Sequence, residues 1–69
     1  MRQFEMRFFD RLGVPILMRV HTAADDLAAL VEAERLSVTH TIEVWEGNRL
    51  VARVKKGYAP TAETERRAL

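Results

Sequence analysis

Apolar and polar residues alternate along four stretches of this chain, and one helical pattern separates the second stretch from the third. In the first stretch Phe4, Met6 and Phe8 share one face, with charged residues between them. A spacing of two is typical of a strand with one buried face, whereas spacings of three and four are typical of an amphipathic helix. The order of the patterns therefore predicts a single α+β domain of the ββαββ kind, spanning residues 1–56.

The first two stretches predict a hairpin that is joined by Arg11, Leu12 and Gly13. In a three-residue loop the last position favours a positive φ, which glycine adopts without strain. The loop sets a register in which apolar residues oppose each other: Phe8 with Ile16, Met6 with Met18, and Phe4 with Val20. A slip of one residue would turn one apolar set toward solvent, so we expect this register to hold.

A helical pattern follows, from about Ala23 to about Leu36. Thr22 is a favourable N-cap residue, and Asp25, three residues later, completes a relative of the capping box. The expected apolar stripe consists of Ala24, Leu27, Ala28, Leu30 and Val31. Its small alanines would let the helix lie close to a sheet.

The second hairpin turns around Glu46-Gly47-Asn48 and admits two registers. A two-residue turn, Gly47-Asn48, would mix apolar and charged residues on both faces, whereas a three-residue loop with a left-handed Asn48 would give one apolar face. The first register pairs Trp45 with Leu50; the second pairs Val44 with Leu50 and Ile42 with Ala52. We favour the second, because a buried face determines register more strongly than turn preference does.

These elements form two layers if the helix covers one face of a four-stranded sheet. The second strand, the helix and the third strand make a crossover, and right-handed crossovers leave few strand orders. We expect a mixed sheet in the order 2-1-4-3, with the first and fourth strands parallel and central. This layout resembles the β-grasp folds, such as ubiquitin, in element order and length.

The inventory of reactive residues argues against catalysis and metal binding. The chain has no cysteine and a single serine, Ser37, which we expect to help terminate the helix. His21 precedes the helix and His40 follows it, so at 1.5 Å per residue they would lie about 20 Å apart, too far to share a metal ion. Asp25 and Asp26 would point about 100° apart on a helix, and therefore would not converge as an acid–base pair. We expect no enzyme activity, no cofactor and no metal site.

The sheet face away from the helix is the candidate binding surface. Large apolar side chains lie among arginines on it, and exposed patches of this kind mark interfaces, in which Trp and Arg are frequent anchors. The candidate interface residues are Phe9, Leu17, Arg19, Trp45, Arg49, Val51 and Arg53. The other interpretation is that Trp45 packs against cross-strand neighbours and only stiffens the sheet.

A chain of 69 residues has a marginal core, and without disulfides or metals a partner subunit is the most available source of further stability. We therefore expect a non-catalytic protein-interaction or assembly module that forms a homodimer through the outer sheet face or an edge strand. The alternative is a single-stranded nucleic-acid binder that uses Trp45 with Arg49, Arg53 and Lys55. The near balance of 11 basic and 10 acidic residues gives no general attraction to nucleic acid or membranes, which weakens this alternative.

The ends of the chain carry simple expectations. Residues 57–69 form a polar tail, either loose or a short helix that starts at Thr61. The N-terminus has a charge at every second or third residue, unlike the core of a signal peptide, and no apolar stretch is long enough to span a bilayer. Together with the lack of cysteine, these features favour a cytoplasmic protein.

The segment Ile42–Arg53 is similar to the closing hairpin, Val-Trp-Glu-Gly-x-Arg-Leu-Val-Ala-Arg, of a group of short bacterial proteins of unknown function. The group shares two further motifs, Phe8-Phe9-Asp10 at the end of the first strand and Ala24-Asp25-Asp26 at the start of the helix. The likeness covers about Phe4 to Val54. It implies the ββαββ fold, and it brings no assigned activity and no site residue.

Overall fold

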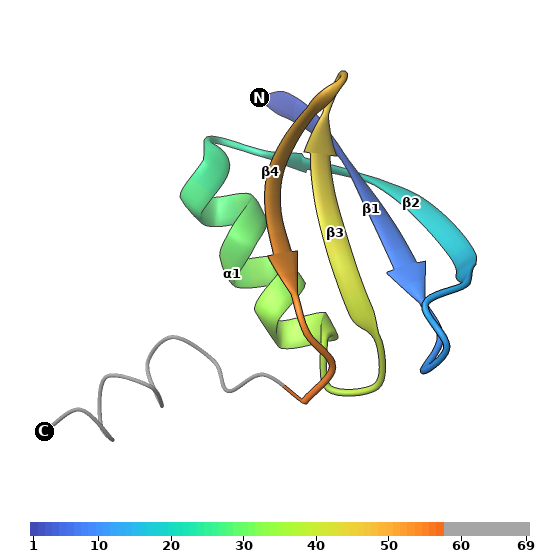
Figure 1. Cartoon of the computed structure of the whole chain (residues 1–69). Coiled ribbons are helices and arrows are strands. Elements are labelled where there is room, and N and C mark those ends of the chain that lie inside the picture. Colours follow the sequence, from blue (N-terminus) through green and yellow to red (C-terminus); the bar gives the residue numbers. More distant parts are fainter. Residues whose placement is uncertain (58–69) are drawn as a thin grey trace, which may run out of the picture.

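The computed structural model describes residues 1–57, which form four strands and one helix in two layers (Figure 1). The elements are β1 (Arg2–Phe9), β2 (Pro15–Ala23), α1 (Asp26–Leu36), β3 (Thr41–Glu46) and β4 (Arg49–Val54). Figure 1 shows α1 on one side of the sheet. The predicted α+β architecture is confirmed, whereas the predicted tail lies, from residue 58 onward, outside the described residues.

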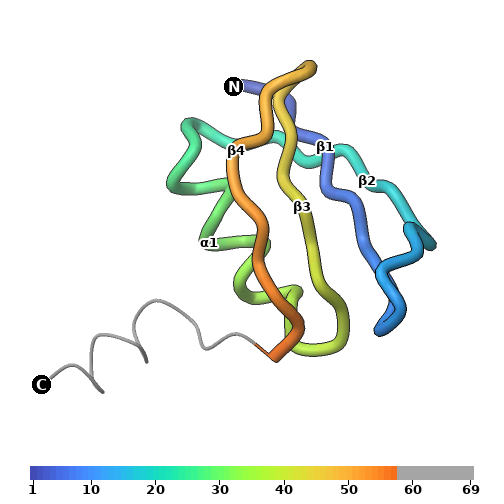
Figure 2. The backbone as a smooth tube through the Cα atoms, in the orientation of Figure 1, coloured from blue at the N-terminus to red at the C-terminus, as the bar shows by residue number. Residues whose placement is uncertain are grey.

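The four strands form one antiparallel sheet in the order β2-β1-β3-β4 (Figure 2). The predicted mixed order 2-1-4-3 is wrong, and with it the likeness to the β-grasp folds. β3 contributes Ile42 and Val44, both fully buried, whereas β4 carries Arg49 and Arg53. The apolar strand takes the central place beside β1, and the charged strand takes the edge, where charges hinder pairing with another chain.

The loop between β1 and β2 has the predicted length and conformation. Gly13 has a φ of 82°, and the backbone amide of Asp10 donates to the Val14 carbonyl at 2.9 Å, which closes a three-residue loop. Asp10 Oδ1 also accepts hydrogen bonds from the backbone amides of Leu12 (2.8 Å) and Val14 (2.9 Å). An Asp side chain that satisfies the amides following it is typical of tight turns.

A β-bulge beside this loop changes the register of β2. Phe9 pairs with Pro15, but Phe8 pairs with Leu17, so Ile16 is an extra residue and the three predicted apolar pairs are wrong. A bulge moves the rest of the strand by one position, and a shift of one residue exchanges the two faces. Leu17, Arg19 and His21 therefore oppose Phe8, Met6 and Phe4 on the helix face, while Met18 and Val20 lie on the outer face.

The second hairpin also combines a tight turn with a bulge. Glu46 pairs with Arg49 across a two-residue turn whose first residue, Gly47, has a φ of 60°. Among the described residues no non-glycine residue has a positive φ, so the favoured loop with a left-handed Asn48 is wrong. A bulge at Val51 then shifts the register, which pairs Trp45 with Leu50, Val44 with Ala52, and Ile42 with Val54. The bulge restores the single apolar face that had favoured the longer loop.

The helix begins later than its sequence pattern predicts. β2 continues to Ala23, and Asp25 is the N-cap, because its carboxylate accepts the Ala28 amide at 2.8 Å; the predicted Thr22 cap is wrong. The predicted apolar stripe is also wrong in part, since Leu27 and Val31 are exposed. The core is a single cluster of Phe4, Met6, Phe8, Ala23, Ala29, Ala33, Ile42, Val44 and Val54. Two alanines, Ala29 and Ala33, thus form the centre of the contact surface of α1, and Leu30 and Leu36 pack beside them.

Candidate functional site

A ladder of contacts crosses the outer face around Trp45. The Arg7 guanidinium lies 4.6 Å from the centre of the Trp45 ring, and Arg7 Nε donates to Glu5 Oε1 at 2.6 Å. Trp45 Nε1 donates to Glu43 Oε1 at 2.9 Å, and Glu43 Oε2 lies 3.5 Å from Arg53 Nε. Trp45 is half-buried and its polar atom is satisfied within the sheet. These contacts fit the interpretation in which Trp45 stiffens the sheet.

The seven predicted interface residues do not share one surface. Phe9, Trp45 and Arg53 lie on the outer face, Leu17 and Arg19 lie on the helix face, Arg49 joins an ion cluster, and Val51 packs against the core. Arg19 on the helix face lies near Glu32 of α1. The pKa of Glu32 is held below its ordinary value first by a hydrogen bond from Arg35, and the nearby His21 and Arg19 lower it further. The bulge at Ile16 therefore divides the predicted surface.

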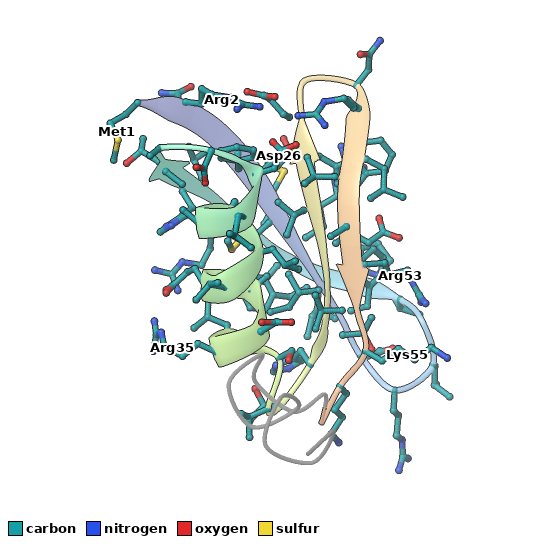
Figure 3. All side chains as sticks on the ribbon, turned by 90° about the vertical axis from the view of Figure 1, so that its left-hand side faces the viewer. Met1, Arg2, Asp26, Arg35, Arg53 and Lys55 are labelled. Atoms are coloured by element: carbon teal, nitrogen blue, oxygen red, sulfur yellow. The ribbon has the colours of Figure 1, made fainter. Side chains whose placement is uncertain are left out.

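Four charged side chains form a closed cluster where β1 and α1 begin and β3 turns into β4; Figure 3 labels two of them, Arg2 and Asp26. Arg2 donates to Glu46 Oε2 and to Asp26 Oδ1, both at 2.8 Å. Arg49 Nη2 donates to Asp26 Oδ1 at 2.9 Å and to Glu46 Oε1 at 2.6 Å. The hydrogen bonds from Arg2 and then Arg49 lower the pKa of Glu46 to about 2. The positive charge of Arg49 is thus compensated by two carboxylates of the same chain.

We expect Glu46→Gln to make the protein less sensitive to acid. The pKa of Glu46 falls from its ordinary value of 4.5 to about 2 in the folded protein, so its ionised form stabilises the fold above pH 4.5 and this contribution is lost as the pH falls toward 2. As the pH falls from 4.5 to about 2, the free energy of unfolding should therefore decrease more for the wild type than for the variant. Thermal unfolding followed by circular dichroism at a series of pH values measures the difference, and parallel curves would contradict it.

The residues considered for catalysis do not converge in the part of the chain that the structure describes. His21 lies in β2, whereas His40 precedes β3 and has its Nδ1 2.8 Å from Thr39 Oγ1. Ser37 is the C-cap of α1, as predicted, and its hydroxyl donates to the Glu34 carbonyl at 2.9 Å. Within residues 1–57, no group of three acidic or histidine side chains is placed to hold a metal ion. Nor is any helix in this range long and apolar enough to cross a membrane.

The sequence pattern placed β2 at an edge of the sheet but did not predict that its apolar side chains are exposed there. β2 has nine residues, and those from Pro15 to Val20 are all exposed. The exposed fraction is 59% for Met18 and 66% for Val20, although the predicted register placed both in the core. The signal was present in Ile16-Leu17-Met18, since three consecutive apolar residues cannot all lie on one face of a strand.

A cavity of about 510 Å³ opens on the outer face, at the end of the sheet opposite the ion cluster. The loop between β1 and β2 forms one wall, and Thr41 and the residues at the end of β4 form another. Figure 3 shows Arg53 and Lys55 leaving the sheet on the side away from α1. The cavity therefore lies on the uncovered side of the sheet.

No family model, curated protein or solved structure matches this chain. The similarity to short bacterial ββαββ proteins stays an expectation. Function has to be inferred from the contacts and exposed surfaces of the chain itself.

Proposed function

We propose that this chain is a non-catalytic assembly module, which pairs with a second copy of itself through the outer edge of β2. The observation that carries the proposal is a nine-residue edge strand with exposed apolar side chains on both of its faces. An edge strand presents unpaired backbone N–H and C=O groups, which the strand of another chain can satisfy. Pairing of two β2 strands would join two four-stranded sheets into one continuous sheet.

The two edges of the sheet differ as expected if one edge is used and the other is protected. Both edge strands contain a bulge, at Ile16 in β2 and at Val51 in β4, but β4 has only six residues and carries the charged side chains of Arg49 and Arg53. Short length, bulges and charges are the means by which proteins prevent edge pairing. β2 is longer, and between Pro15 and Val20 its single charge is Arg19. This contrast supports β2 as the pairing edge.

β2 is complementary to itself when two copies run antiparallel about a two-fold axis at Met18. Met18 then faces Met18 of the second copy, and Leu17 faces Arg19. On the remaining positions Ile16 faces Val20, so apolar residues oppose each other and no like charges are paired. A symmetric interface must match one patch to itself, and this register does so.

Other positions of the axis are less favourable. An axis at Leu17 would set Val20 against Val14, which lies outside β2, and would therefore pair fewer residues of the strand. An axis at Arg19 would oppose two guanidinium groups, and like charges directly opposite each other are destabilising. An axis at Val20 would set Met18 against Thr22 and leave Ile16 without a partner. We therefore place the axis at Met18.

The nucleic-acid alternative has less support in this geometry. Stacking platforms for single strands need a free aromatic face and available cations along the groove. Arg7 covers one face of the Trp45 ring, Arg49 donates to two carboxylates, and Arg53 contacts Glu43. Two of the three cations assigned to that surface, Arg49 and Arg53, are thus engaged within the protein, and only Lys55 has no carboxylate partner among residues 1–57.

Single-cysteine cross-linking tests the proposed pairing, because the wild-type chain has no cysteine. Opposed residues of an antiparallel pair have Cα atoms about 4.5–5.5 Å apart, within the range of about 4.4–6.8 Å that a disulfide needs. Met18→Cys should therefore form a linked dimer under mild oxidation. The two copies of Val20→Cys would lie four residues apart along the strands, about 13 Å, and should not link. Non-reducing gel electrophoresis measures both.

Two controls make the outcome decisive. A mixture of Ile16→Cys and Val20→Cys chains should link to each other, which shows that the cysteine at position 20 can react. Met18→Lys places a charge on the edge, and it should be monomeric with an unchanged circular dichroism spectrum. Efficient linking of Arg19→Cys would overturn the axis, and a wild type that stays monomeric in sedimentation at about 100 μM would overturn the pairing itself.

A further inference from the structure

Most of the unpaired cations within residues 1–57 gather in one place. Arg2, Arg7, Arg35, Arg49 and Arg53 each lie within ion-pair distance of a carboxylate. In the described part of the chain Arg11, Arg19, Lys55 and Lys56 have no such partner. Of these four, all but Arg19 line the cavity of about 510 Å³ beside the β1–β2 loop. Within residues 1–57, unpaired positive charge is therefore concentrated at this cavity.

The polar groups of the cavity are arranged to leave donors free. Asp10 is the acidic residue in the lining, and its Oδ1 is occupied by the amides of Leu12 and Val14. Thr41 Oγ1 accepts the Lys56 amide at 3.0 Å, which leaves the hydroxyl proton available for donation. Arg53 approaches Glu43 through Nε at 3.5 Å, and its Nη groups have no partner among residues 1–57. Ammonium, guanidinium and hydroxyl donors thus line one space.

We propose that this cavity binds a small anion that carries two or more phosphate groups. Lysine and arginine donors from two elements can approach several phosphate oxygens at once, and hydrogen bonds between such charged groups are the strong ones. The volume lies within the range of about 300–1,000 Å³ that is usual for small-molecule sites. Phe9 adds an apolar ring to the wall, against which the base of a nucleotide can pack.

The site is separate from the edge of β2. None of the residues that line the cavity belongs to Pro15–Val20, so the binding of an anion does not depend on self-association. The monomeric variant Met18→Lys should therefore bind the anion as the wild type does. Failure of one proposal leaves the other standing.

Titration of the isotope-labelled full chain with pyrophosphate at low salt, followed by amide chemical shifts, tests the site. We expect saturable shifts in residues 11–13 and in Lys55 and Lys56. The double substitution Lys55→Gln/Lys56→Gln should weaken binding by at least about tenfold, because it removes two charged donors. Arg19→Gln removes an unpaired cation outside the cavity, and it should change the affinity by less than about twofold.

Three results would overturn the proposal: no saturable shifts, shifts spread over the whole surface, or an equal loss in Arg19→Gln and the double variant. The last two would mean that diffuse charge attracts the anion. A parallel titration with adenosine triphosphate separates the sources of the phosphate. Equal affinity supports recognition of the phosphates alone, whereas tighter binding that is lost in Phe9→Leu supports a nucleotide.

Discussion

Phe4→Ala should remove a large part of the free energy of unfolding of this domain. Phe4 is 1% exposed and belongs to the core cluster between the sheet and α1. Removal of a buried phenylalanine side chain costs about 3–5 kcal/mol. A chain of 69 residues has a free energy of unfolding of about 3–10 kcal/mol in total. Urea unfolding followed by circular dichroism should show the native baseline shortened or absent.

Phe9→Ala is the matched control, because it removes the same side chain from the same strand. Phe9 lies on the outer face and is only half-buried, so its removal should cost about 1 kcal/mol. A loss as large as that of Phe4→Ala would mean that the outer face is covered in solution. Phe9→Ala touches neither the ion cluster nor the outer edge of β2, whereas Phe4→Ala also removes the ring whose centre lies 5.3 Å from the Arg2 guanidinium.

The faces of β1 could be predicted from sequence because Phe4, Met6 and Phe8 alternate with charged residues. The same reasoning failed for β2, where Ile16, Leu17 and Met18 are all apolar. Either face of such a strand can be buried, so the pattern does not select the register. The bulge at Ile16 decides it, and a bulge changes pairing without a local sequence signal of its own. The predicted strand order already placed β2 at an edge, but the exposure of Met18 and Val20 followed from the bulge, so it could not be predicted.

The strand order had a signal in the charges. β4 carries Arg49 and Arg53, which suit an edge, and β3 supplies the fully buried Ile42 and Val44. Phe9, Trp45 and Arg53 lie on the outer face, as the sequence pattern predicted, whereas other residues of the candidate interface do not. Leu17 was misplaced by a bulge, and Arg49 was misplaced because it pairs with Asp26 at the start of α1 and with Glu46 at the end of β3. Contacts between distant segments of this kind are not visible in local patterns.

Ala33→Leu should destabilise the domain by about 1–3 kcal/mol or more, since additional carbon atoms in a packed core force side chains and backbone to shift. Ala33 is fully buried where α1 meets the sheet, as is Ala29. The side chains that a larger residue would displace belong to the same core cluster. Urea unfolding monitored by circular dichroism measures the loss, which should appear as a lower midpoint with an unchanged slope.

Ala28→Leu is the control, because Ala28 lies on the exposed side of the same helix. Alanine and leucine are both strong helix formers, so this variant should stay within about 0.5 kcal/mol of the wild type. The difference between the two variants in free energy of unfolding therefore shows how little space there is between the helix and the sheet. That space also explains why Leu27 and Val31 are exposed: rotation of α1 to bury them would require the helix to move away from the sheet. Equal losses in the two variants would contradict an alanine contact surface.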